Sequence, residues 1–272
     1  REEEFNKIKF LSSEKMMLSS KEIIFQKSDQ FYKKKDIFEV VLLNKVLTDG
    51  LQIYCDQISK DGTKIFSLIQ WFEINFNRIP AEFFSMYDFY TSKFIKFSKN
   101  SFQLRLKRVG DIFFSLFLIV ITFPVVCLII FLIKIEDNGP ILYSQMRSGF
   151  KGKVFKLWKF RSMKENSELN GPQWAKAEDS RITLIGNFMR RCRLDELPQL
   201  INVIAGDMSL IGPRPERPEI DNQLNKEILM YSLRYNMRPG LSGWAQVNYP
   251  YGASINDAKI KLSYDMFYIQ NF

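Results

Sequence analysis

Two adjacent acids, Asp195 and Glu196, follow a run of arginines and stand just before a proline and a short apolar series. Pro198 suits the first turn of a helix, and the apolar residues after it predict a short helix that closes near Gly206. Both carboxylates would then lie at the helix N-terminus, where backbone amides and the helix dipole favour negative charge. Capping explains one such acid, whereas two acids beside arginines could hold a hard cation, act as a nucleophile and meet a diphosphate.

Basic side chains stand in a block before these acids and in another after them. The earlier block ends in Lys159 and Arg161 and predicts a strand over residues 154–160 with a cationic polar face, able to contact anionic lipid or hold a phosphate. In the later block, three prolines stiffen a loop and fix where Arg214 and Arg217 point, which suits phosphate oxygens.

The composition limits the chemistry that these residues can perform. None of the 272 residues is histidine, which excludes Ser-His-Asp and Cys-His mechanisms and imidazole zinc sites. Three cysteines without a CxxC pair support neither a disulfide framework nor a metal cluster. Lys and Arg total 39 against 30 Asp and Glu, and this net charge of +9 favours an anionic partner: nucleic acid, a phosphorylated metabolite or acidic lipid.

The elements that must position these residues fall into two parts, with a boundary near residues 98–103. In residues 1–100, an apolar run at 37–43, a helical segment at 45–59 and a strand that opens 63–76 predict a small α/β unit. This part has no P-loop and no GxGxxG, so nucleotide binding by those loops has no support. The chain begins with arginine and stops inside an apolar, aromatic run, so we expect it to be a piece of a longer protein.

The second part, residues 101–272, opens with a hydrophobic segment. No charged residue lies between Asp111 and Lys134, and a continuous helix over those 22 residues is about 33 Å long, enough to cross the core of a bilayer. Pro124, near the middle, predicts a kink. Both flanks are basic, and a positive-inside bias would place both ends in the cytoplasm. We therefore expect a re-entrant membrane helix over residues 109–135, a hairpin broken at Pro124 that enters and leaves by the same face, and composition leaves a membrane-spanning helix as the alternative.

Residues 105–272 resemble the catalytic domain of the bacterial sugar transferases called monotopic phosphoglycosyl transferases. The blocks that carry the resemblance are KRVGD at 107–111, GPILYSQMRSG at 139–149, KFRSM at 159–163, RLDELPQLINV at 193–203, GDMSLIGPRPERPE at 206–219, RPGLSGWAQVNYPYGAS at 238–254 and YDMFYI at 264–269. Residues 1–100 look like the C-terminal part of the regulatory α/β domain of the larger members, nucleotide-binding-like but degenerate. The expected fold class is therefore α/β (α+β): a membrane-associated catalytic domain with a re-entrant hydrophobic helix, preceded by part of a regulatory domain.

The resemblance implies a reaction. Members of the family move a sugar-1-phosphate from a UDP-sugar to polyprenyl phosphate, release UMP and require Mg²⁺, at the first membrane step of exopolysaccharide, capsule or O-antigen synthesis. By the matching positions, Asp195 would be the nucleophile that forms a covalent phosphosugar–aspartate intermediate, and Glu196 would bind the metal with it or assist the proton inventory. A carboxylate that attacks a diphosphate needs its charge repulsion screened, which a cation and arginines can do. Magnesium also fits oxygen ligands and the absence of histidine.

The resemblance also implies further site residues and partners. Phosphate contacts are expected from Lys159, Arg161, Arg193 and Arg214, and active-site support from Arg147, Arg217, Arg238 and Asp265. The expected partners are a UDP-sugar, undecaprenyl phosphate and inner-membrane lipid, with the catalytic domain on the cytoplasmic face of the bacterial inner membrane. Larger members suggest a homodimer. No nucleic-acid partner is expected, because a membrane segment beside the basic stretch favours lipid and phosphate.

Two other functions remain open, and so does the identity of the sugar. One is a non-covalent membrane-bound nucleotide-sugar glycosyltransferase that uses Glu196 as its base. The other is a non-catalytic, membrane-tethered scaffold for polysaccharide assembly.

Residues 238–247, in the block that begins at Arg238, are expected to form a turn that leads into a half-buried strand.

Overall fold

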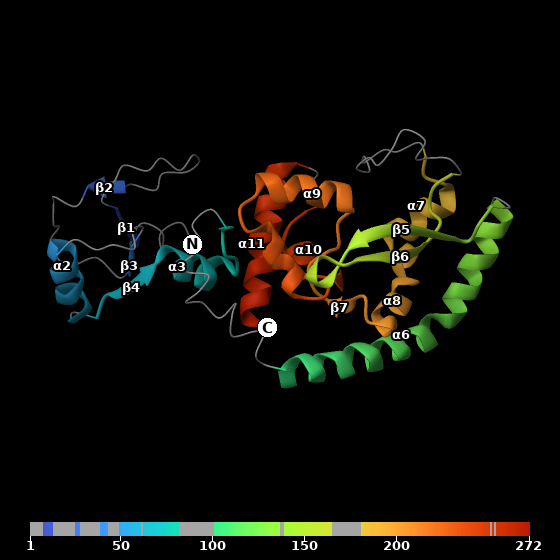
Figure 1. Cartoon of the computed structure of the whole chain (residues 1–272), viewed down its shortest axis with the longest axis horizontal. Coiled ribbons are helices and arrows are strands. Elements are labelled where there is room, and N and C mark those ends of the chain that lie inside the picture. The colour runs from blue at the N-terminus through green and yellow to red at the C-terminus, as the bar shows by residue number, and fades with distance from the viewer. Residues whose placement is uncertain are drawn as a thin grey trace. The chain divides into compact units, whose positions relative to one another are not determined.

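The chain divides into two compact units, Arg1–Phe84 and Ser85–Phe272. The computed structural model describes residues 8–12, 25–27, 39–42, 49–60, 62–81, 101–136, 139–164, 181–250, 252 and 254–272. In Figure 1 the first unit runs from blue to cyan and the second from green to red. The boundary that the sequence predicts near residues 98–103 meets the start of a helix at Ser101, and residues 82–100 lie outside the described ranges.

The first unit contains a parallel sheet and two helices. Its elements are β1 (Ile8–Ser12), β2 (Phe25–Lys27), β3 (Glu39–Leu42), α2 (Asp49–Lys60), β4 (Lys64–Ser67) and α3 (Leu68–Phe76). The strands pair in the order β2-β1-β3-β4 and all run parallel. Val40, Val41 and Trp71 are buried, and a capping box between Ser67 and Gln70 starts α3. The strand, helix and strand predicted for this region are confirmed as β3, α2 and β4, while its regulatory role stays a prediction.

The second unit joins one long helix to a small α+β body. Its elements are α6 (Ser101–Glu136), β5 (Leu142–Ser148), η3 (Phe150–Gly152), β6 (Val154–Phe160), α7 (Leu184–Arg191), η4 (Leu194–Glu196), α8 (Gln199–Ala205), β7 (Ser209–Ile211), α9 (Pro218–Glu227), η5 (Tyr231–Asn236), β8 (Gly240–Ser242), α10 (Trp244–Asn248) and α11 (Ile255–Asn271), where η marks a 3-10 helix. Strands β5 and β6 form an antiparallel hairpin, and β7 and β8 form a parallel pair.

The half-buried strand predicted over residues 238–247 is wrong for its second half. Only Gly240–Ser242 form a strand, and Trp244 begins helix α10. The backbone at Gly240 and Gly243 lies so close to Gly212 that a side chain at either position would collide with it. This close approach pairs the short strand with β7 and leaves the chain to turn into a helix directly afterwards.

The β5–β6 hairpin presents one face to the body of the unit. In its register Lys159 lies opposite Tyr143, and Arg147 opposite Phe155. Because side chains alternate along a strand, Lys159 shares its face with the buried Phe155, whereas the exposed Lys156 lies on the other face. The strand predicted over 154–160 is confirmed, but its single cationic face is wrong, since Lys156 and Lys159 are three residues apart.

Helix α6 remains continuous through Pro124 and bends partway along its length, as Figure 1 shows. The expected kink therefore takes the form of a bend in an unbroken helix. Near the proline, the Thr122 hydroxyl donates to the Leu118 carbonyl at 2.7 Å. The helix is long and apolar enough to cross a membrane by length and composition: its most apolar window has a mean hydropathy of 3.3, and 11% of that window is buried inside the structure.

The N-terminal end of α6 is attached to the body by polar contacts. The Asp111 carboxylate is buried, pairs with Lys107 at 3.4 Å, and accepts hydrogen bonds from the Ser209 hydroxyl at 2.8 Å and the Leu210 amide at 3.1 Å. The Arg108 guanidinium donates to the last carbonyls of α8. These contacts join the first turns of α6 to β7 and α8.

The C-terminal half of α6 is attached by apolar packing. Ile129 and Ile133 are buried against Phe160, at the end of β6, and Met189 of α7. The Glu136 carboxylate also accepts a hydrogen bond from an amide at the start of α7. Both ends of α6 thus contact the same compact unit.

Candidate active site

The two adjacent acids lie in a tight turn of their own. Asp195 and Glu196 are in the 3-10 helix η4, and α8 begins only at Gln199, after the proline. The predicted helix is confirmed from Gln199 onward and ends at Gly206 in the left-handed region, but the acids precede it. Arg193, the residue just before this turn, has a left-handed backbone conformation with φ 59°. Both carboxylates are buried.

Asn202 of α8 sets the distance between this turn and the hairpin. Its side-chain Nδ2 donates to the backbone carbonyl of Lys156 at 2.8 Å, and its side-chain Oδ1 accepts from the backbone amide of Trp158 at 3.2 Å. Asn202 therefore pairs with the free edge of β6 as another strand would. Since Lys159 follows Trp158 directly, the contact brings its strand against the acidic turn.

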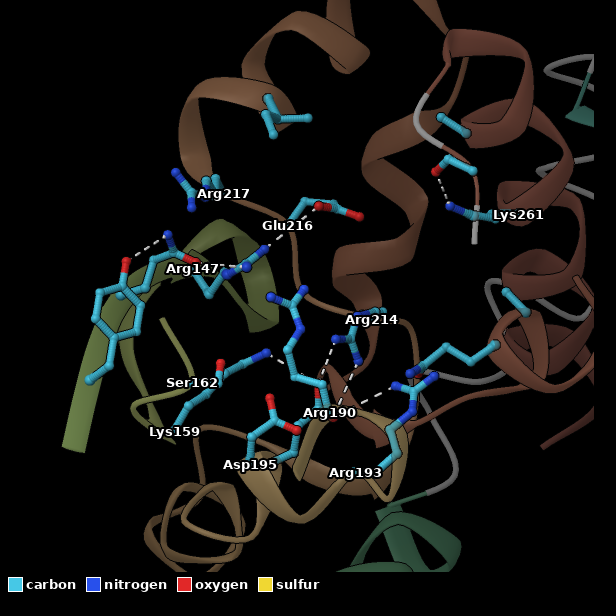
Figure 2. A pocket seen from close by; sticks show the side chains of 18 of the residues that line it. Arg147, Lys159, Ser162, Arg190, Arg193, Asp195, Arg214, Glu216, Arg217 and Lys261 are labelled. Carbon is cyan, nitrogen blue, oxygen red and sulfur yellow. Dashed lines mark hydrogen bonds and ion pairs between the residues drawn. The ribbon is translucent and has the colours of Figure 1, made fainter. Parts of the chain in front are cut away.

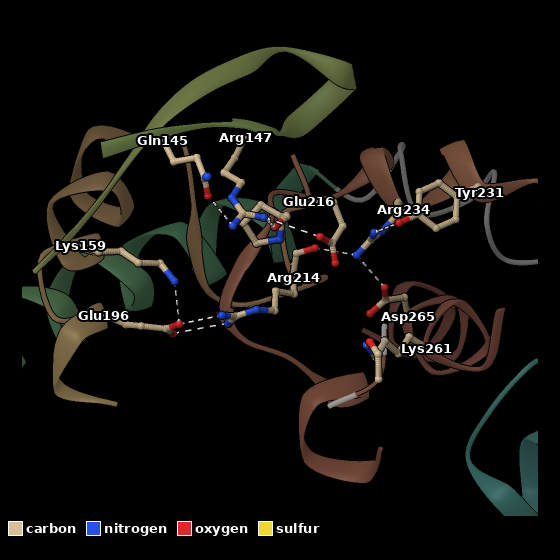
Figure 3. A network of polar contacts seen from close by, with 12 residues as sticks. Gln145, Arg147, Lys159, Glu196, Arg214, Glu216, Tyr231, Arg234, Lys261 and Asp265 are labelled. Atoms are coloured by element: carbon tan, nitrogen blue, oxygen red, sulfur yellow. Dashed lines mark hydrogen bonds and ion pairs between the residues drawn. The ribbon is translucent and has the colours of Figure 1, made fainter. Parts of the chain in front are cut away.

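The Glu196 carboxylate is the centre of an ion-pair cluster. It accepts from Arg214 at 2.7 Å and from Lys159 at 3.1 Å, and Arg193 lies 3.9 Å away. Burial alone would raise the pKa of Glu196, but Arg214 and Lys159 outweigh it and lower that pKa to about 2. Figure 3 shows Lys159 and Arg214 meeting this carboxylate from two sides. Glu196 therefore stays ionised at any physiological pH.

Asp195 is in a different electrostatic state from its neighbour. Burial raises the pKa of Asp195, Lys159 opposes that rise, and the charge of Glu196 adds to it. Figure 2 shows Asp195 and Arg193 on the same turn, with Lys159 and Arg214 reaching toward it. A desolvated carboxylate with a raised pKa is a stronger nucleophile than one held by two cations, so of the two acids Asp195 suits attack and Glu196 suits positioning.

A cavity of about 740 Å³ opens above these acids and is strongly cationic. Its lining includes eleven basic side chains: Arg147, Lys159, Arg161, Lys164, Arg181, Arg190, Arg193, Arg214, Arg217, Arg234 and Lys261. Among the residues that the structure describes, four acids line it: Asp195, Glu196, Glu216 and Asp265. Eleven basic against four acidic side chains leave this described lining with a net +7, which attracts an anion with several negative charges.

The structure brings nearly all of the predicted site residues to this cavity. Both predicted catalytic acids, all four predicted phosphate-binding cations, and Arg147, Arg217 and Asp265 line it. Arg161 is buried and its guanidinium lies against the backbone of Gly139, where a side chain would collide with it. Arg238 is not among the residues that line the cavity in the described part of the chain. Its Nε donates to the Gly206 carbonyl at 2.9 Å instead.

Sequence reasoning did not find the buried pair behind Arg214. Arg234 of η5 pairs with Asp265 of α11 at 3.2 Å, and both side chains are buried. Burial raises the pKa of Asp265 to about 6 although Arg234 opposes the rise. Figure 3 shows Glu216 and Arg234 beyond Arg214, on the side away from Glu196. Arg234 belongs to no block of the family resemblance, and only its place in the fold reveals it.

The two acids could contribute oxygen ligands to a divalent cation. Among the described residues, no group of three or more Asp, Glu, Cys or His side chains could hold a metal ion. Asp195 and Glu196 are two oxygen donors, and two basic groups already neutralise Glu196. Mg²⁺ is commonly held by one or two carboxylates together with substrate phosphates and water, which is the arrangement that this donor set allows.

Comparison with known proteins agrees with this geometry. The sequence model of the family described as "Bacterial sugar transferase" matches residues 102–272. The chain belongs to this family. The match runs from the second residue of α6 to the end of the chain, so the bacterial sugar transferase region contains the whole cavity and both attachments of α6. The resemblance in the sequence blocks is thereby confirmed.

Several curated relatives are similar over the same region. The chain is 45% identical over 167 residues to the UDP-N-acetylgalactosamine-undecaprenyl-phosphate N-acetylgalactosaminephosphotransferase of Aeromonas hydrophila, covering 61% of this chain and 40% of that protein. It is 40% identical over 169 residues to the UDP-glucose:undecaprenyl-phosphate glucose-1-phosphate transferase of Escherichia coli K12, covering 61% and 36%.

A third relative is matched over most of its length. The putative undecaprenyl-phosphate N-acetylgalactosaminyl 1-phosphate transferase of Bacillus subtilis is 48% identical over 136 residues, which are 50% of this chain and 76% of that protein. In contrast, the chain spans well under half the length of the first two relatives.

Proposed function

We propose that this bacterial sugar transferase moves a sugar-1-phosphate from a UDP-sugar to undecaprenyl phosphate and releases UMP through a covalent intermediate on Asp195. The observation that carries the proposal is the presence of two adjacent buried acids, one with a raised and one with a lowered pKa, in a cavity whose described lining has a net charge of +7. The relatives' names support the general reaction, because they describe undecaprenyl-phosphate sugar phosphotransferases.

The proposed reaction has two displacements at one phosphorus. In the first, an Asp195 carboxylate oxygen attacks the β-phosphorus of the UDP-sugar, and the bond from that phosphorus to the bridging oxygen breaks, so UMP leaves with that oxygen. In the second, a phosphate oxygen of undecaprenyl phosphate attacks the same phosphorus and releases the carboxylate. Each step forms one phosphorus–oxygen bond and breaks one, and UMP leaves as a stable anion without needing a proton donor.

Glu196 acts by positioning in this scheme. With a pKa of about 2 it is ionised throughout and takes up no proton near neutral pH. Before the substrate binds, the Glu196 carboxylate pairs with Lys159 at 3.1 Å and with Arg214 at 2.7 Å, and so holds both cations in the cavity that Asp195 lines. A diphosphate that enters the cavity meets both cations already in place, and their charge offsets the repulsion between the Asp195 carboxylate and the donor.

We also propose that Mg²⁺ is required and that Asp195 and Glu196 contribute to its site together with the diphosphate oxygens. Bound Mg²⁺ supplies charge screening between a carboxylate and a diphosphate. A readout besides turnover is available, because binding of the ion should depend on the diphosphate. Calorimetry should detect Mg²⁺ binding to the protein with UDP present and little binding without it. Equal binding in both conditions would contradict a site that the nucleotide completes.

The attachment of α6 at both ends supports a re-entrant membrane helix at the cytoplasmic face of the bacterial inner membrane. A straight helix that crossed the bilayer core would hold its two ends about 30 Å apart on opposite sides. Asp111 and Ile133 instead contact one compact unit, and the helix bends between them. A cysteine-free variant with either Arg105→Cys or Lys134→Cys should react with an impermeant maleimide from the cytoplasmic side in both cases; labelling from opposite sides would contradict the proposal.

Mass spectrometry of the intact protein tests the chemistry directly. The protein is incubated with Mg²⁺ and UDP-glucose or UDP-N-acetylgalactosamine, the sugars that the relatives' names contain, and without lipid acceptor. We expect UMP release and a mass increase of one phosphosugar, located on Asp195 and absent from Asp195→Asn. Glu227→Gln is the matched control, since Glu227 is exposed on α9 and this variant should form the adduct.

Two further measurements, product release with the lipid acceptor added and sugar transfer in cells, separate the two alternatives. A non-covalent glycosyltransferase would release UDP rather than UMP, and only with acceptor present. A non-catalytic scaffold would leave sugar transfer in cells intact in Asp195→Asn. The opposite pKa shifts of the two adjacent acids, upward for Asp195 and downward for Glu196, favour the covalent route over both. Formation of a homodimer stays a prediction.

A further inference from the structure

The segment that carries Arg214 has an unusual set of backbone contacts. Residues 213–216 read Pro-Arg-Pro-Glu, and both prolines are buried. Four successive carbonyls of this segment each accept one hydrogen bond from outside it. Those of residues 213 and 216 accept from the amides of Gly240 and Ser148 at 2.9 and 3.0 Å, which ties the segment to strands β8 and β5.

The two inner carbonyls accept from arginine side chains. The Arg234 guanidinium donates to the Arg214 carbonyl at 2.6 Å, and the Arg147 guanidinium donates to the Pro215 carbonyl at 3.0 Å. The two guanidiniums thus hold two successive carbonyls, those of residues 214 and 215, which lie on either side of the Pro215 ring. Since Pro215 has no amide hydrogen, the segment cannot continue as a strand with alternating donors and acceptors at this point.

Each of these arginines is itself fixed by several partners. Arg147 also donates to the Gln145 amide oxygen at 2.7 Å and lies 3.6 Å from the Glu216 carboxylate. Arg234 is buried, pairs with Asp265 and contacts the Tyr231 hydroxyl. A planar guanidinium with donors in fixed directions can join a carboxylate and a carbonyl at the same time, which a lysine ammonium cannot do with the same geometry.

We propose that Arg147 and Arg234 are positioning residues that act through Arg214: by holding the carbonyls of residues 214 and 215, they help to fix the guanidinium of Arg214 against Glu196 and over the place where a diphosphate binds. The Arg214 side chain is one-third exposed and pairs with Glu196 at 2.7 Å. The ion pair holds the end of the side chain, and the backbone that Arg147 and Arg234 hold sets where the side chain starts. This inference rests on the proposed function only for the identity of the anion, a diphosphate.

A binding experiment with inorganic pyrophosphate tests this role. Calorimetry on the whole chain in detergent compares Arg147→Met in the unsubstituted background and in the Arg214→Met background. Loss of the positioning contact should weaken pyrophosphate binding about tenfold in the unsubstituted background, which corresponds to about 1.4 kcal/mol. In the Arg214→Met background, where the guanidinium is gone, the further loss should be under about twofold, because interacting residues are not additive.

Variants at Arg234 and at a distant arginine complete the test. Arg234→Met with Asp265→Asn removes the buried pair together, avoids leaving an unpaired buried charge, and should give the same two-background pattern. Arg147→Lys should recover only part of the affinity. Arg108→Met is the control, since Arg108 also donates to the backbone, at Ile204, but does not contact residues 213–216. It should lower thermal stability and leave pyrophosphate affinity unchanged.

The outcomes separate this inference from the proposed reaction. Equal losses in both backgrounds would mean that Arg147 and Arg234 act independently of Arg214, which would overturn the inference, as would a failure of the unsubstituted chain to bind pyrophosphate. Absence of a phosphosugar adduct would overturn the covalent reaction but would leave the coupling between Arg147 and Arg214 measurable by binding.

Discussion

Replacing Glu196 with Gln should reveal how strongly its two cations are held. The pairing lowers the pKa of Glu196 from 4.5 to about 2. Each pKa unit corresponds to about 1.4 kcal/mol, so the folded protein gains about 3 kcal/mol from the ionised carboxylate near neutral pH. Glu196→Gln loses that gain. For a unit of this size, about 3 kcal/mol lowers the melting temperature by roughly 6–12 °C.

The pH dependence gives the sign of this effect. A carboxyl group whose pKa is lowered by folding stabilises the protein above its unfolded value, near 4.5, and that stability disappears as the pH falls toward 2. The melting temperatures of the unsubstituted protein and of Glu196→Gln should therefore differ most at pH 6–7 and converge between about pH 5 and 2.

Thermal unfolding followed by tryptophan fluorescence across this pH range is the assay. Glu227→Gln is the control, because Glu227 is exposed on α9 and its replacement should shift neither curve. Two parallel curves, with the same difference at low and neutral pH, would refute the reasoning that Arg214 and Lys159 keep Glu196 ionised.

Three further predictions concern the nucleophile and the long helix. Asp195→Asn removes the attacking group, so it should lower sugar-phosphate transfer, measured by UMP release, by a factor on the order of 10³ or more. It also removes a buried charge, so the melting temperature should rise or stay the same. Activity within tenfold of the unsubstituted protein would contradict the covalent route. Asp111→Ala should cost about 3–5 kcal/mol, read from denaturant unfolding, because it leaves Lys107 partly buried without its counter-charge. Pro124→Leu restores a missing amide donor and should straighten α6, so that Lys134→Cys in this background loses part of its labelling from the cytoplasmic side; unchanged labelling would place the cause of the bend elsewhere.

Local patterns in the sequence predicted the elements around the site well. The uncharged run predicted a long helix and Pro124 a bend in it, because helix length and proline geometry are properties of the local chain. The alternation in residues 154–160 predicted β6. Matching blocks brought Asp195, Glu196 and Arg214 into one candidate site, and they do line one cavity.

Contacts between distant segments were outside the reach of such patterns. Lys159 pairs with Glu196 because Asn202 joins α8 to the edge of β6, and no spacing in the sequence encodes that distance. Nothing in the local sequence around Arg234 indicates that it is buried, because its partner Asp265 lies on a distant segment of the chain. Trp244 begins a helix where a strand was predicted, because β8 ends after its close approach to Gly212.

The left-handed backbone conformation of Arg193 lowers thermal stability, whereas the charge of its side chain favours binding of the proposed donor. A residue with a β-carbon is disfavoured at φ 59° by about 1 kcal/mol, and glycine would adopt this conformation without strain. Arg193→Gly should therefore melt at a higher temperature and bind the nucleotide sugar less well, since it removes a cation 3.9 Å from Glu196. Laboratory selection for heat resistance alone would drift toward glycine at this position, whereas selection for turnover would keep the arginine.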